Sequence, residues 1–228
     1  MKVALLNHTP EPERTVYMAA RLCYSASAIE ELRDKSRGAS YEKFLSRILS
    51  MGHTSVLEHA SFTFGIEGIS RATSHQLVRH RLASYSQQSQ RYVRMSGPDY
   101  VTPASIAKDP AQKKRFDNAI KRAYKLYGEL TAEGVPQEDA RYLLPNAAET
   151  KIIVTMNARE LLHFFKLRCC ERAQWEIRDM AVLMLAEVKK AAPFIFTDAG
   201  PSCVRGPCNE GAMTCGRPKE IRRKFKGL

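Results

Sequence analysis

The stretch ASFTFGIEGISRATSHQLVRHR, residues 60–81, decides the fold. Phe62 and the apolar residues at every second position after it predict a strand over residues 60–66 with one apolar face. Ser70 is a favourable N-cap, so we expect a helix that runs from there to about Arg81. A strand that leads directly into a helix indicates a mixed architecture.

The remainder of the chain also mixes strands with helices. Further strands are expected at residues 1–7, 92–93 and 151–156, a polar loop at 84–90, and helices at 9–23, 41–51, 111–133, 138–144, 158–170 and 173–192. Because strands and long helices do not alternate strictly, they predict the α+β class: a compact mixed domain with a β-sheet flanked by long helices. Residues 1–199 would form this domain, and residues 200–228 a Cys-containing, basic and irregular C-terminal extension.

The composition is that of a folded, non-membrane protein. The chain has 228 residues, of which 44% are hydrophobic and 26% charged, which suits one large domain. No apolar run approaches the roughly 18 residues of a membrane span, so no membrane association is expected. The N-terminus turns polar too soon for a signal peptide, and we therefore expect a cytoplasmic protein.

The net charge of +12 is unevenly distributed. Residues 217–228 hold six basic side chains against Glu220 alone, a pattern typical of a solvated end. The rest of the chain is also basic, which favours partners rich in phosphate or carboxylate, or nucleic acid.

Six cysteines occur, and without a secretory signal they do not indicate a disulfide framework. Cys203, Cys208 and Cys215 lie close together in the sequence but have no local fourth ligand, so they are a weak metal signal. We expect incidental or redox-active thiols and no metal site.

Arginines gather between Glu67 and Asp99, where no carboxylate and no lysine occurs. The stretch holds Arg71, Arg79, Arg81, Arg91 and Arg94, with His75 and His80. Repeated use of arginine indicates bidentate recognition of phosphate or of planar polar rings, and the short polar side chains of residues 84–90 suit a nucleotide. The alternative is a basic surface for RNA or DNA, although this loop offers only two tyrosines for base stacking.

A second concentration of chemistry is the segment 157–172. Arg168 shares one side of the expected helix with three apolar residues: Leu161, Phe164 and Phe165. An arginine on an apolar face needs an anionic partner, which could be a structural carboxylate such as Glu171 or Glu176, or a bound substrate. The chain contains neither G-x-G-x-x-G nor a Walker loop, which disfavours Rossmann and P-loop nucleotide sites.

These residues resemble the flavin-dependent thymidylate synthase family. Arg79-His80-Arg81, seven residues and then Ser89 match its R-H-R-x7-S signature. Further matching blocks are Gly52-His53-Thr54-Ser55 with Glu58-His59, Arg91-Tyr92, Ala140-Arg141 before Leu144-Pro145, Asn157-Ala158-Arg159, and Leu167-Arg168 before Ala173-Gln174-Trp175-Glu176-Ile177. The blocks keep the family's order over about residues 1–197.

The resemblance implies a role for each matching position. Arg168 would be the activating catalytic residue, stabilising negative charge on the uracil ring, and His53 would lie near the flavin and the folate. FAD would be held by Ser55, Arg79, His80, Arg81, Gln87, Asn157, Ala158, Arg159 and His163. The substrate dUMP would be bound by Gln76, Leu77, Val78, Arg79, Gln87, Gln88, Ser89, Gln90, Arg91, Arg141 and Arg168.

The resemblance also implies a reaction and an assembly. A methyltransferase of this family converts dUMP to dTMP, with methylenetetrahydrofolate as carbon donor and FAD, reduced by NADPH, as hydride carrier. The family is a homotetramer whose active sites are shared between subunits, with the loop 87–91 supplied by a neighbour, and nucleic acid is not among the expected partners. Position 87 is commonly acidic in the family, whereas Gln87 can hydrogen-bond but cannot act as a base.

A rival enzyme class is the conventional thymidylate synthase, whose nucleophilic cysteine lies in a Pro-Cys-His setting. Here Pro207-Cys208 is followed by Asn209 and lies outside the matching blocks, so this alternative is disfavoured.

Overall fold

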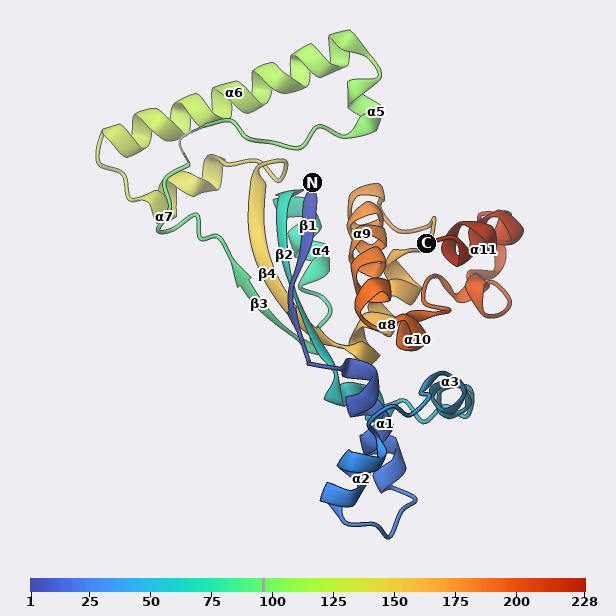
Figure 1. Ribbon diagram of the computed structural model, residues 1–228. Coiled ribbons are helices and arrows are strands. Elements are labelled where there is room, and N and C mark those ends of the chain that lie inside the picture. Colours follow the sequence, from blue (N-terminus) through green and yellow to red (C-terminus); the bar gives the residue numbers. More distant parts are fainter. Residues whose placement is uncertain (96) are drawn as a thin grey trace. The chain divides into compact units, whose positions relative to one another are not determined.

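The computed structural model describes residues 1–95 and 97–228. It contains a four-stranded sheet with the strand order β1-β2-β4-β3 (Figure 1). The strands are β1 Lys2–His8, β2 Ser61–Ser70, β3 Ala83–Gln87 and β4 Glu149–Asn157. A sheet combined with long helices confirms the predicted α+β class.

The chain divides into two compact units. Unit 1 comprises residues 1–2, 66–79 and 85–153, and unit 2 comprises residues 3–65, 80–84 and 154–228. All four strands contribute residues to both units, and residues 200–228 belong to unit 2. The domain boundary expected at residue 200 stays a prediction.

Helix α4, Arg71–Leu77, lies in unit 1 and begins where the sequence predicts. The Ser70 hydroxyl oxygen accepts the N–H of Thr73 at 3.1 Å, which confirms the predicted N-cap. The helix ends four residues earlier than expected. Its Leu77 carbonyl accepts the Tyr85 hydroxyl at 2.9 Å, so a side chain satisfies a carbonyl that a longer helix would have used.

Two expectations for the segment after α4 are wrong. Residues 83–87 form the strand β3, where a polar loop was expected, and alternate residues along it are half-buried. Residues 92–93 are not a strand, because the Val93 N–H donates to the Ser89 carbonyl at 3.0 Å and closes a turn.

The helical part of unit 1 is built around α6, Pro110–Ala132 (Figure 1). Asp109 caps this helix by accepting the N–H groups of residues 111 and 112, and the chain turns at Gly134 with a φ of 96°. Ile120 and Tyr124 of α6 pack with Ala148 in a buried cluster. The short elements nearby are α5 Ala104–Ala107, α7 Gln137–Ala140 and the 3₁₀ turn η2 Arg141–Leu143.

Aromatic side chains form the core of unit 2. Phe62 of β2 meets Phe196 at a ring-centroid distance of 5.4 Å, and Phe165 meets Phe196 at 6.0 Å. These rings come from β2, α8 Ala158–Arg168 and α10 Pro193–Phe196, and α9 Trp175–Ala191 packs on α8 (Figure 1). Pro193 therefore starts a further short helix as well as ending α9.

The N-terminal helices of unit 2 are α1 Pro12–Leu22, α2 Ile29–Lys35 and α3 Glu42–Ser50, with the 3₁₀ turn η1 Ser55–His59. Helix α1 starts later than expected, because Thr9 instead exchanges two hydrogen bonds of 2.9 Å with Ser61 and so extends the pairing of β1 with β2. Helix α2 was not predicted.

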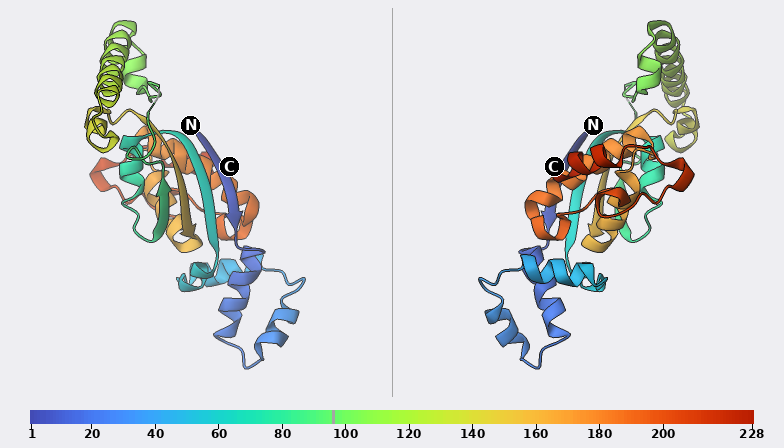
Figure 2. Two further views of the ribbon diagram at one scale, coloured as in Figure 1. Left: turned by 90° about the vertical axis from the view of Figure 1, so that its left-hand side faces the viewer. Right: turned by 90° about the vertical axis from the view of Figure 1, so that its right-hand side faces the viewer.

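The C-terminal residues are folded, so the expectation of an irregular extension is wrong. They contain the 3₁₀ turns η3 Ser202–Val204 and η4 Gly211–Met213 and the helix α11 Pro218–Lys226 (Figure 2). Ile221 and Phe225 of α11 are only 3% and 1% exposed. Lys189 of α9 donates to the Phe225 carbonyl at 2.8 Å, which ties α11 to α9. Among the described residues, no helix is both long and apolar enough to cross a membrane.

Candidate active site

His80 holds Arg168 in the interior of unit 2. The Nε of Arg168 donates to Nε2 of His80 at 3.0 Å, and Nδ1 of His80 lies 3.1 Å from Oε1 of Glu160. His80 and Glu160 are only 5% and 6% exposed. The three side chains form a hydrogen-bonded chain from a carboxylate through an imidazole to a guanidinium.

The hydrogen-bond pattern assigns His80 as neutral. Because Nε2 accepts from Arg168, the ring proton lies on Nδ1 and is donated to Glu160. Burial lowers the pKa of His80 below its ordinary value, and the charge of Arg168 lowers it further, although the hydrogen bond to Glu160 acts in the opposite direction.

Helix α8 presents the guanidinium beside aromatic rings. The Phe164 ring meets the His80 ring edge-on with centroids 4.9 Å apart, and the His163 ring lies 5.9 Å from it. Burial lowers the pKa of Arg168, but a guanidinium stays charged at neutral pH. Within the described part of the chain, no protein acceptor is found for the two Nη groups of Arg168, which can therefore receive an anionic ligand.

Glu171 is not the partner of Arg168 that the sequence allowed. It pairs instead with Arg178 at 3.4 Å and with Arg217 at 3.1 Å. Sequence reasoning missed Glu160, because a glutamate in the first turn of a helix is ordinarily explained by the helix dipole. Its spacing of eight residues from Arg168 on the same helix was the available signal.

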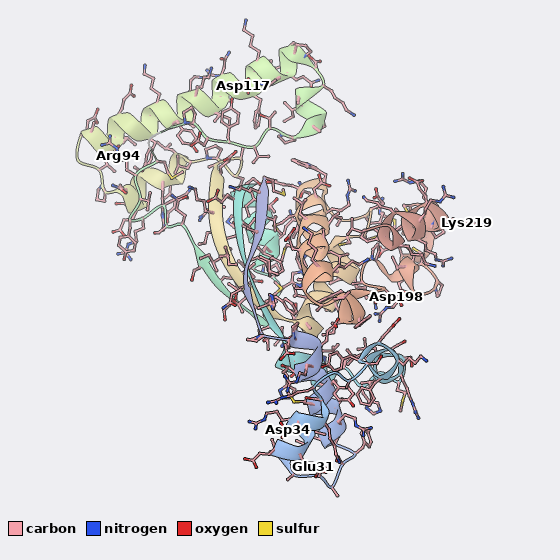
Figure 3. All side chains as sticks on the ribbon, in the orientation of Figure 1. Glu31, Asp34, Arg94, Asp117, Asp198 and Lys219 are labelled. Atoms are coloured by element: carbon pink, nitrogen blue, oxygen red, sulfur yellow. The ribbon has the colours of Figure 1, made fainter. Side chains whose placement is uncertain are left out.

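A pocket of about 430 Å³ lies in unit 2 beside the N-terminal half of α8. Arg159, His163 and Lys166 line one side of it, and residues 198–202 with 205–207 and Asn209 line the other (Asp198 is labelled in Figure 3). Arg159 is anchored at 2.5 Å by Glu58, whereas His163 is exposed. Cationic and apolar side chains together suit a ligand that combines a flat ring with phosphates.

The other arginines that the sequence singled out meet in unit 1. Glu138 contacts two of them: its carboxylate pairs with Nε of Arg91, and its carbonyl accepts Nε of Arg141 at 3.1 Å. Arg71, which was not predicted to bind substrate, donates to the Gln88 carbonyl at 3.4 Å. Burial lowers the pKa of Arg71, and the charge of Arg141 lowers it further, so these two guanidiniums lie close together. One carboxylate beside three arginines leaves an excess of positive charge.

Gln87 is anchored inside unit 1 by its amide. Its Nε2 donates to Ser74 Oγ at 2.9 Å and to Thr150 Oγ1 at 3.1 Å. The next residues of the loop differ in their hydrogen bonding. Ser89 Oγ accepts the N–H of Arg91 at 3.1 Å. Gln90 is only 9% exposed, and its Nε2 has no hydrogen-bond partner among the described residues. An unsatisfied buried amide is costly, so Gln90 fits a site that a polar ligand completes.

Exposure divides the remaining predicted residues. Leu77 and Ala158 are fully buried, so only their backbones could meet a ligand, and the Ala158 N–H already donates to the Ala60 carbonyl at 2.8 Å. Gln76, Gln88 and Asn157 are half-buried, and Asn157 caps α8 by accepting the Glu160 N–H at 2.9 Å. The exposed residues are His53, Ser55, Val78, Arg79 and Arg81.

Within each unit, the structure brings predicted residues together. Unit 2 gathers His80, Arg168, Arg159 and His163, and unit 1 gathers Arg91, Arg141 and the loop 87–90. In the part of the chain that the structure describes, one guanidinium has no carboxylate partner, other arginines are in excess, and a pocket lies open nearby in unit 2. Together these features are typical of an enzyme that binds anionic, ring-containing ligands.

Comparison with known proteins names the family. The chain belongs to the Thy1 family, thymidylate synthase complementing protein, whose model matches residues 4–194. It is 61% identical over 230 residues to the flavin-dependent thymidylate synthase of Geobacter sulfurreducens, covering 100% of this chain and 99% of that protein. The flavin-dependent thymidylate synthase of Clostridium tetani is 49% identical over 241 residues, covering 99% and 97%. The likeness therefore includes residues after 197, which the sequence motifs did not reach.

Two solved structures share the fold. The UMP/dUMP methylase PolB from Streptomyces cacaoi, bound with 5-Br dUMP, superposes with a TM-score of 0.73 at 25% identity, covering 86% of this chain and 92% of that chain. The flavin-dependent thymidylate synthase ThyX from Helicobacter pylori, complexed with FAD and dUMP, superposes with a TM-score of 0.72 at 23% identity, covering 88% and 100%. The second likeness bears on the fold alone.

Proposed function

We propose that the chain is a flavin-dependent thymidylate synthase: a methyltransferase that converts dUMP to dTMP with FAD. Methylenetetrahydrofolate would supply the carbon, and NADPH the reducing equivalents. The observation that carries the proposal is the hydrogen bond from Arg168 to a neutral, buried His80, because it orients a guanidinium that no carboxylate of the described residues neutralises.

Arg168 would act on the uracil ring. When C5 of a uracil forms a new bond to carbon, negative charge develops on the ring carbonyl oxygen. Hydrogen-bond donors fixed in a water-poor site stabilise such charge far more than donors in bulk water do. His80 occupies only the Nε of Arg168, so both Nη groups remain for the substrate. His80 and Glu160 would be positioning residues.

Arg91 and Arg141 would bind the 5′-phosphate. Guanidiniums suit phosphate because they form two parallel hydrogen bonds, and their joint contact with Glu138 supports a common role. Arg71 would add to the same positive field. Ser89 and Gln90 on the neighbouring loop offer short polar groups for the nucleotide, and the unsatisfied amide of Gln90 supports that role.

The residues around the unit 2 pocket fit FAD. Arg159 suits its diphosphate, and His163 together with the apolar Leu57 and Leu162 suits its rings. Ser55, Arg79, Arg81 and the α8 cap Asn157 would complete the set of FAD contacts, while His53, on the exposed turn before η1, would lie near the folate. When bound, FAD supplies the hydride chemistry that no amino-acid side chain can supply.

We further infer a homotetramer whose active sites combine residues of different subunits. Apolar side chains are exposed between the proposed ligand-binding residues: Val78, Leu82, Tyr92 and Tyr142 are 40%, 71%, 76% and 86% exposed. Such residues are typical of surfaces that a partner covers. Arg79, Arg81 and Arg91 are exposed in the same segments, so a neighbouring chain could complete their sites.

An omission assay tests the function. Purified protein is incubated with dUMP, methylenetetrahydrofolate, NADPH and FAD, and dTMP is quantified with each component left out in turn. We expect product only in the complete mixture, and bleaching of the flavin by NADPH. A protein that takes up no FAD but binds oligonucleotides with a steep salt dependence would support the nucleic-acid alternative instead.

The phosphate assignment has its own test. Arg91→Ala should weaken dUMP binding by about 10-fold or more while FAD binding changes little, because a forked guanidinium–phosphate contact is lost. The matched control is Arg122→Ala, an exposed arginine of α6 that should leave both affinities unchanged. Equal losses of dUMP and FAD binding would argue against the phosphate role.

A further inference from the structure

Two distant segments of unit 2 bring four of the six cysteines within electrostatic range of one another. Cys170 follows the end of α8, while Cys203, Cys208 and Cys215 lie in the chain that precedes α11. In the sequence, only the last three lie near one another. The fold brings Cys170 into their neighbourhood as a fourth cysteine.

Polar contacts next to the cysteines fix this arrangement. Glu171, beside Cys170, pairs at 3.1 Å with Arg217, two residues after Cys215. At the other end, the N–H of Asn209, beside Cys208, donates at 3.4 Å to the hydroxyl of Ser202, beside Cys203.

Helix α11 joins the two pairs of cysteines. Arg222 donates from Nε to the Cys203 carbonyl at 2.6 Å and from Nη2 to the Gly206 carbonyl at 2.8 Å. The same helix has Arg217, the partner of Glu171, as its N-cap residue. One short helix therefore holds both the end of α8 and the loop of the late cysteines.

The thiols are close enough to affect one another electrostatically. Burial raises the pKa of Cys170, and nearby Cys208 and Cys215 raise it further, while the backbone N–H of Arg172 lowers it. Burial likewise raises the pKa of Cys203, and its neighbours Cys208, Cys170 and Cys215 add to the effect. These mutual effects place the four thiols in one neighbourhood of unit 2, which agrees with the polar contacts beside them.

We propose that Cys170, Cys203, Cys208 and Cys215 are the ligands of one structural Zn²⁺ ion, which fastens the C-terminal segment to the end of α8. Four thiolates are a complete tetrahedral set for zinc, and such closed sites stabilise small, loop-rich segments. Binding converts four thiols and one Zn²⁺ into a zinc tetrathiolate of charge −2 and releases four protons to solvent. No group is oxidised or reduced.

The charge of the segment suits this centre. A tetrathiolate leaves two negative charges to be balanced. The arginines Arg172, Arg205 and Arg217 lie within two residues of a proposed ligand and outnumber the acids Glu171 and Glu210, which are equally near. Among the described residues, no three candidate ligand side chains lie close enough together to hold a metal ion. The four thiols must therefore move closer to one another when the ion binds. Gly211 and Gly216, with φ of 51° and 72°, place the chain in turns that only glycine adopts readily.

The other two cysteines do not fit the site. Cys169 is 1% exposed, and burial strongly raises the pKa of its thiol, which makes it an inert core residue. Cys23 lies exposed at the end of α1, where its thiol contacts the Ala19 carbonyl. It provides a matched control, because it is a free thiol outside the proposed cluster.

Metal analysis of the full-length protein tests the proposal. The protein is expressed with added zinc, desalted and analysed by plasma mass spectrometry for zinc and iron. We expect about one zinc per chain in the wild type and in Cys23→Ser. Cys203→Ser and Cys208→Ser should each lose at least about 90% of the metal, because three thiolates bind zinc much more weakly than four.

A second measurement does not depend on whether these variants fold. Wild-type protein stripped of metal and flavin is titrated with Co²⁺, and we expect an intense thiolate-to-cobalt absorption that saturates at one ion per chain and that zinc abolishes. The absence of both bound zinc and this absorption would overturn the proposal. So would iron with acid-labile sulfide in place of zinc, zinc retained by both serine variants, or a disulfide between any two of the four cysteines.

Discussion

Arg168 lies in a setting that stability alone does not explain. Its guanidinium is half-buried on a helix face with Phe164 and Phe165, and its identified protein partner is a neutral imidazole. Desolvating a cation is unfavourable by several kcal/mol, and a hydrogen bond to a neutral acceptor offsets only part of this free energy. A bound anionic ligand would offset the rest. We therefore interpret Arg168 as a residue that serves binding and catalysis.

Replacing Arg168 with lysine tests whether its positive charge alone is sufficient or whether the planar guanidinium is required. Arg168→Lys keeps the positive charge, but a single ammonium cannot bond to His80 and to a substrate carbonyl in the same planar geometry. We expect kcat for dTMP formation to fall about 100-fold or more, with FAD binding unchanged. Single-turnover assays and flavin titration measure the two effects. Arg47→Lys, on the exposed face of α3, is the control, and near-normal turnover by Arg168→Lys would remove Arg168 from its role.

The neutral state of His80 predicts how stability depends on pH. Burial lowers the folded-state pKa of His80 below the ordinary 6.5. As the pH falls below about 6.5, His80 becomes protonated in the unfolded chain but stays neutral in the folded chain. The stability that neutral His80 provides is therefore complete above this pH and decreases as the pH falls towards the lowered pKa.

Thermal unfolding of His80→Gln measures this effect, because glutamine does not titrate. The Tm advantage of the wild type over the variant should shrink between about pH 8 and pH 5. His59→Gln, which removes an exposed histidine, should show no such trend. A constant or growing advantage of the wild type at low pH would mean that His80 is protonated in the folded protein.

The sequence revealed the arginines and histidines of the site but not their partners. Arginine enrichment between residues 67 and 99 and the signature at residues 79–89 pointed directly to the residues that we propose to bind ligands. The carboxylates Glu138 and Glu160 were missed, because each lies in the first turn of a helix, where an acid needs no special explanation. Glu138 pairs with Arg91, 47 residues away in the sequence, and Glu160 contacts His80, 80 residues away. Local sequence patterns cannot predict contacts over such separations.

At the scale of elements, helix α11 makes the basic C-terminal end part of the fold. Most of its charged residues are exposed, while Ile221 and Phe225 are buried four residues apart on one side. Gly200 leaves room for Phe225, because a Cβ at position 200 would lie 2.9 Å from the Phe225 ring. The composition of residues 217–228, with six cations and few apolar residues, suggested a solvated tail. The helical spacing of Ile221 and Phe225 instead allows the segment to pack on the rest of unit 2.

The packing of α11 predicts a large effect from one substitution. Phe225→Ala removes a fully buried ring and should lower the free energy of unfolding by about 3–5 kcal/mol. Arg223→Ala, an exposed change on the same helix, should alter it by no more than about 0.5 kcal/mol. Urea unfolding followed by far-ultraviolet circular dichroism measures both. If the two variants were equally stable, α11 would not be an integral part of unit 2.

Long elements were predictable and short connecting elements were not. Helix α6, with its Asp109 cap and the glycine turn after it, carries strong local signals and matches its predicted range within one residue at each end. The alternating strand β2 was also predicted, but it extends to Ser70, four residues beyond its predicted end. Strand β3 consists largely of serine and glutamine, which local preference assigns to loops. Strand β3 forms because its backbone pairs with the neighbouring strand β4. The pairing continues just past β3, where the Gln88 N–H donates to the Lys151 carbonyl at 2.9 Å.

For the whole molecule, the open question is which subunit supplies each arginine. Arg91 and Arg168 belong to different units of the chain, and both are proposed to bind the same nucleotide. Tyr92 and Tyr142 are exposed near the proposed phosphate-binding arginines, as expected of a surface that another chain would cover in the proposed homotetramer. A site built from two chains would place Arg91 of one subunit opposite Arg168 of another.

Mixing two inactive variants decides between these arrangements. Arg91→Ala and Arg168→Lys are each expected to be nearly inactive alone, but a hybrid assembly contains interfaces in which one chain supplies the intact Arg91 and the other the intact Arg168. With random assembly, about a quarter of the sites would be complete, so co-refolded mixtures should regain up to about 25% of wild-type dTMP formation. Size-exclusion chromatography with light scattering establishes the oligomer, and Arg91→Ala co-refolded with itself is the control. If both arginines came from the same chain, no hybrid would contain an intact pair, and the mixture would stay as inactive as its parents.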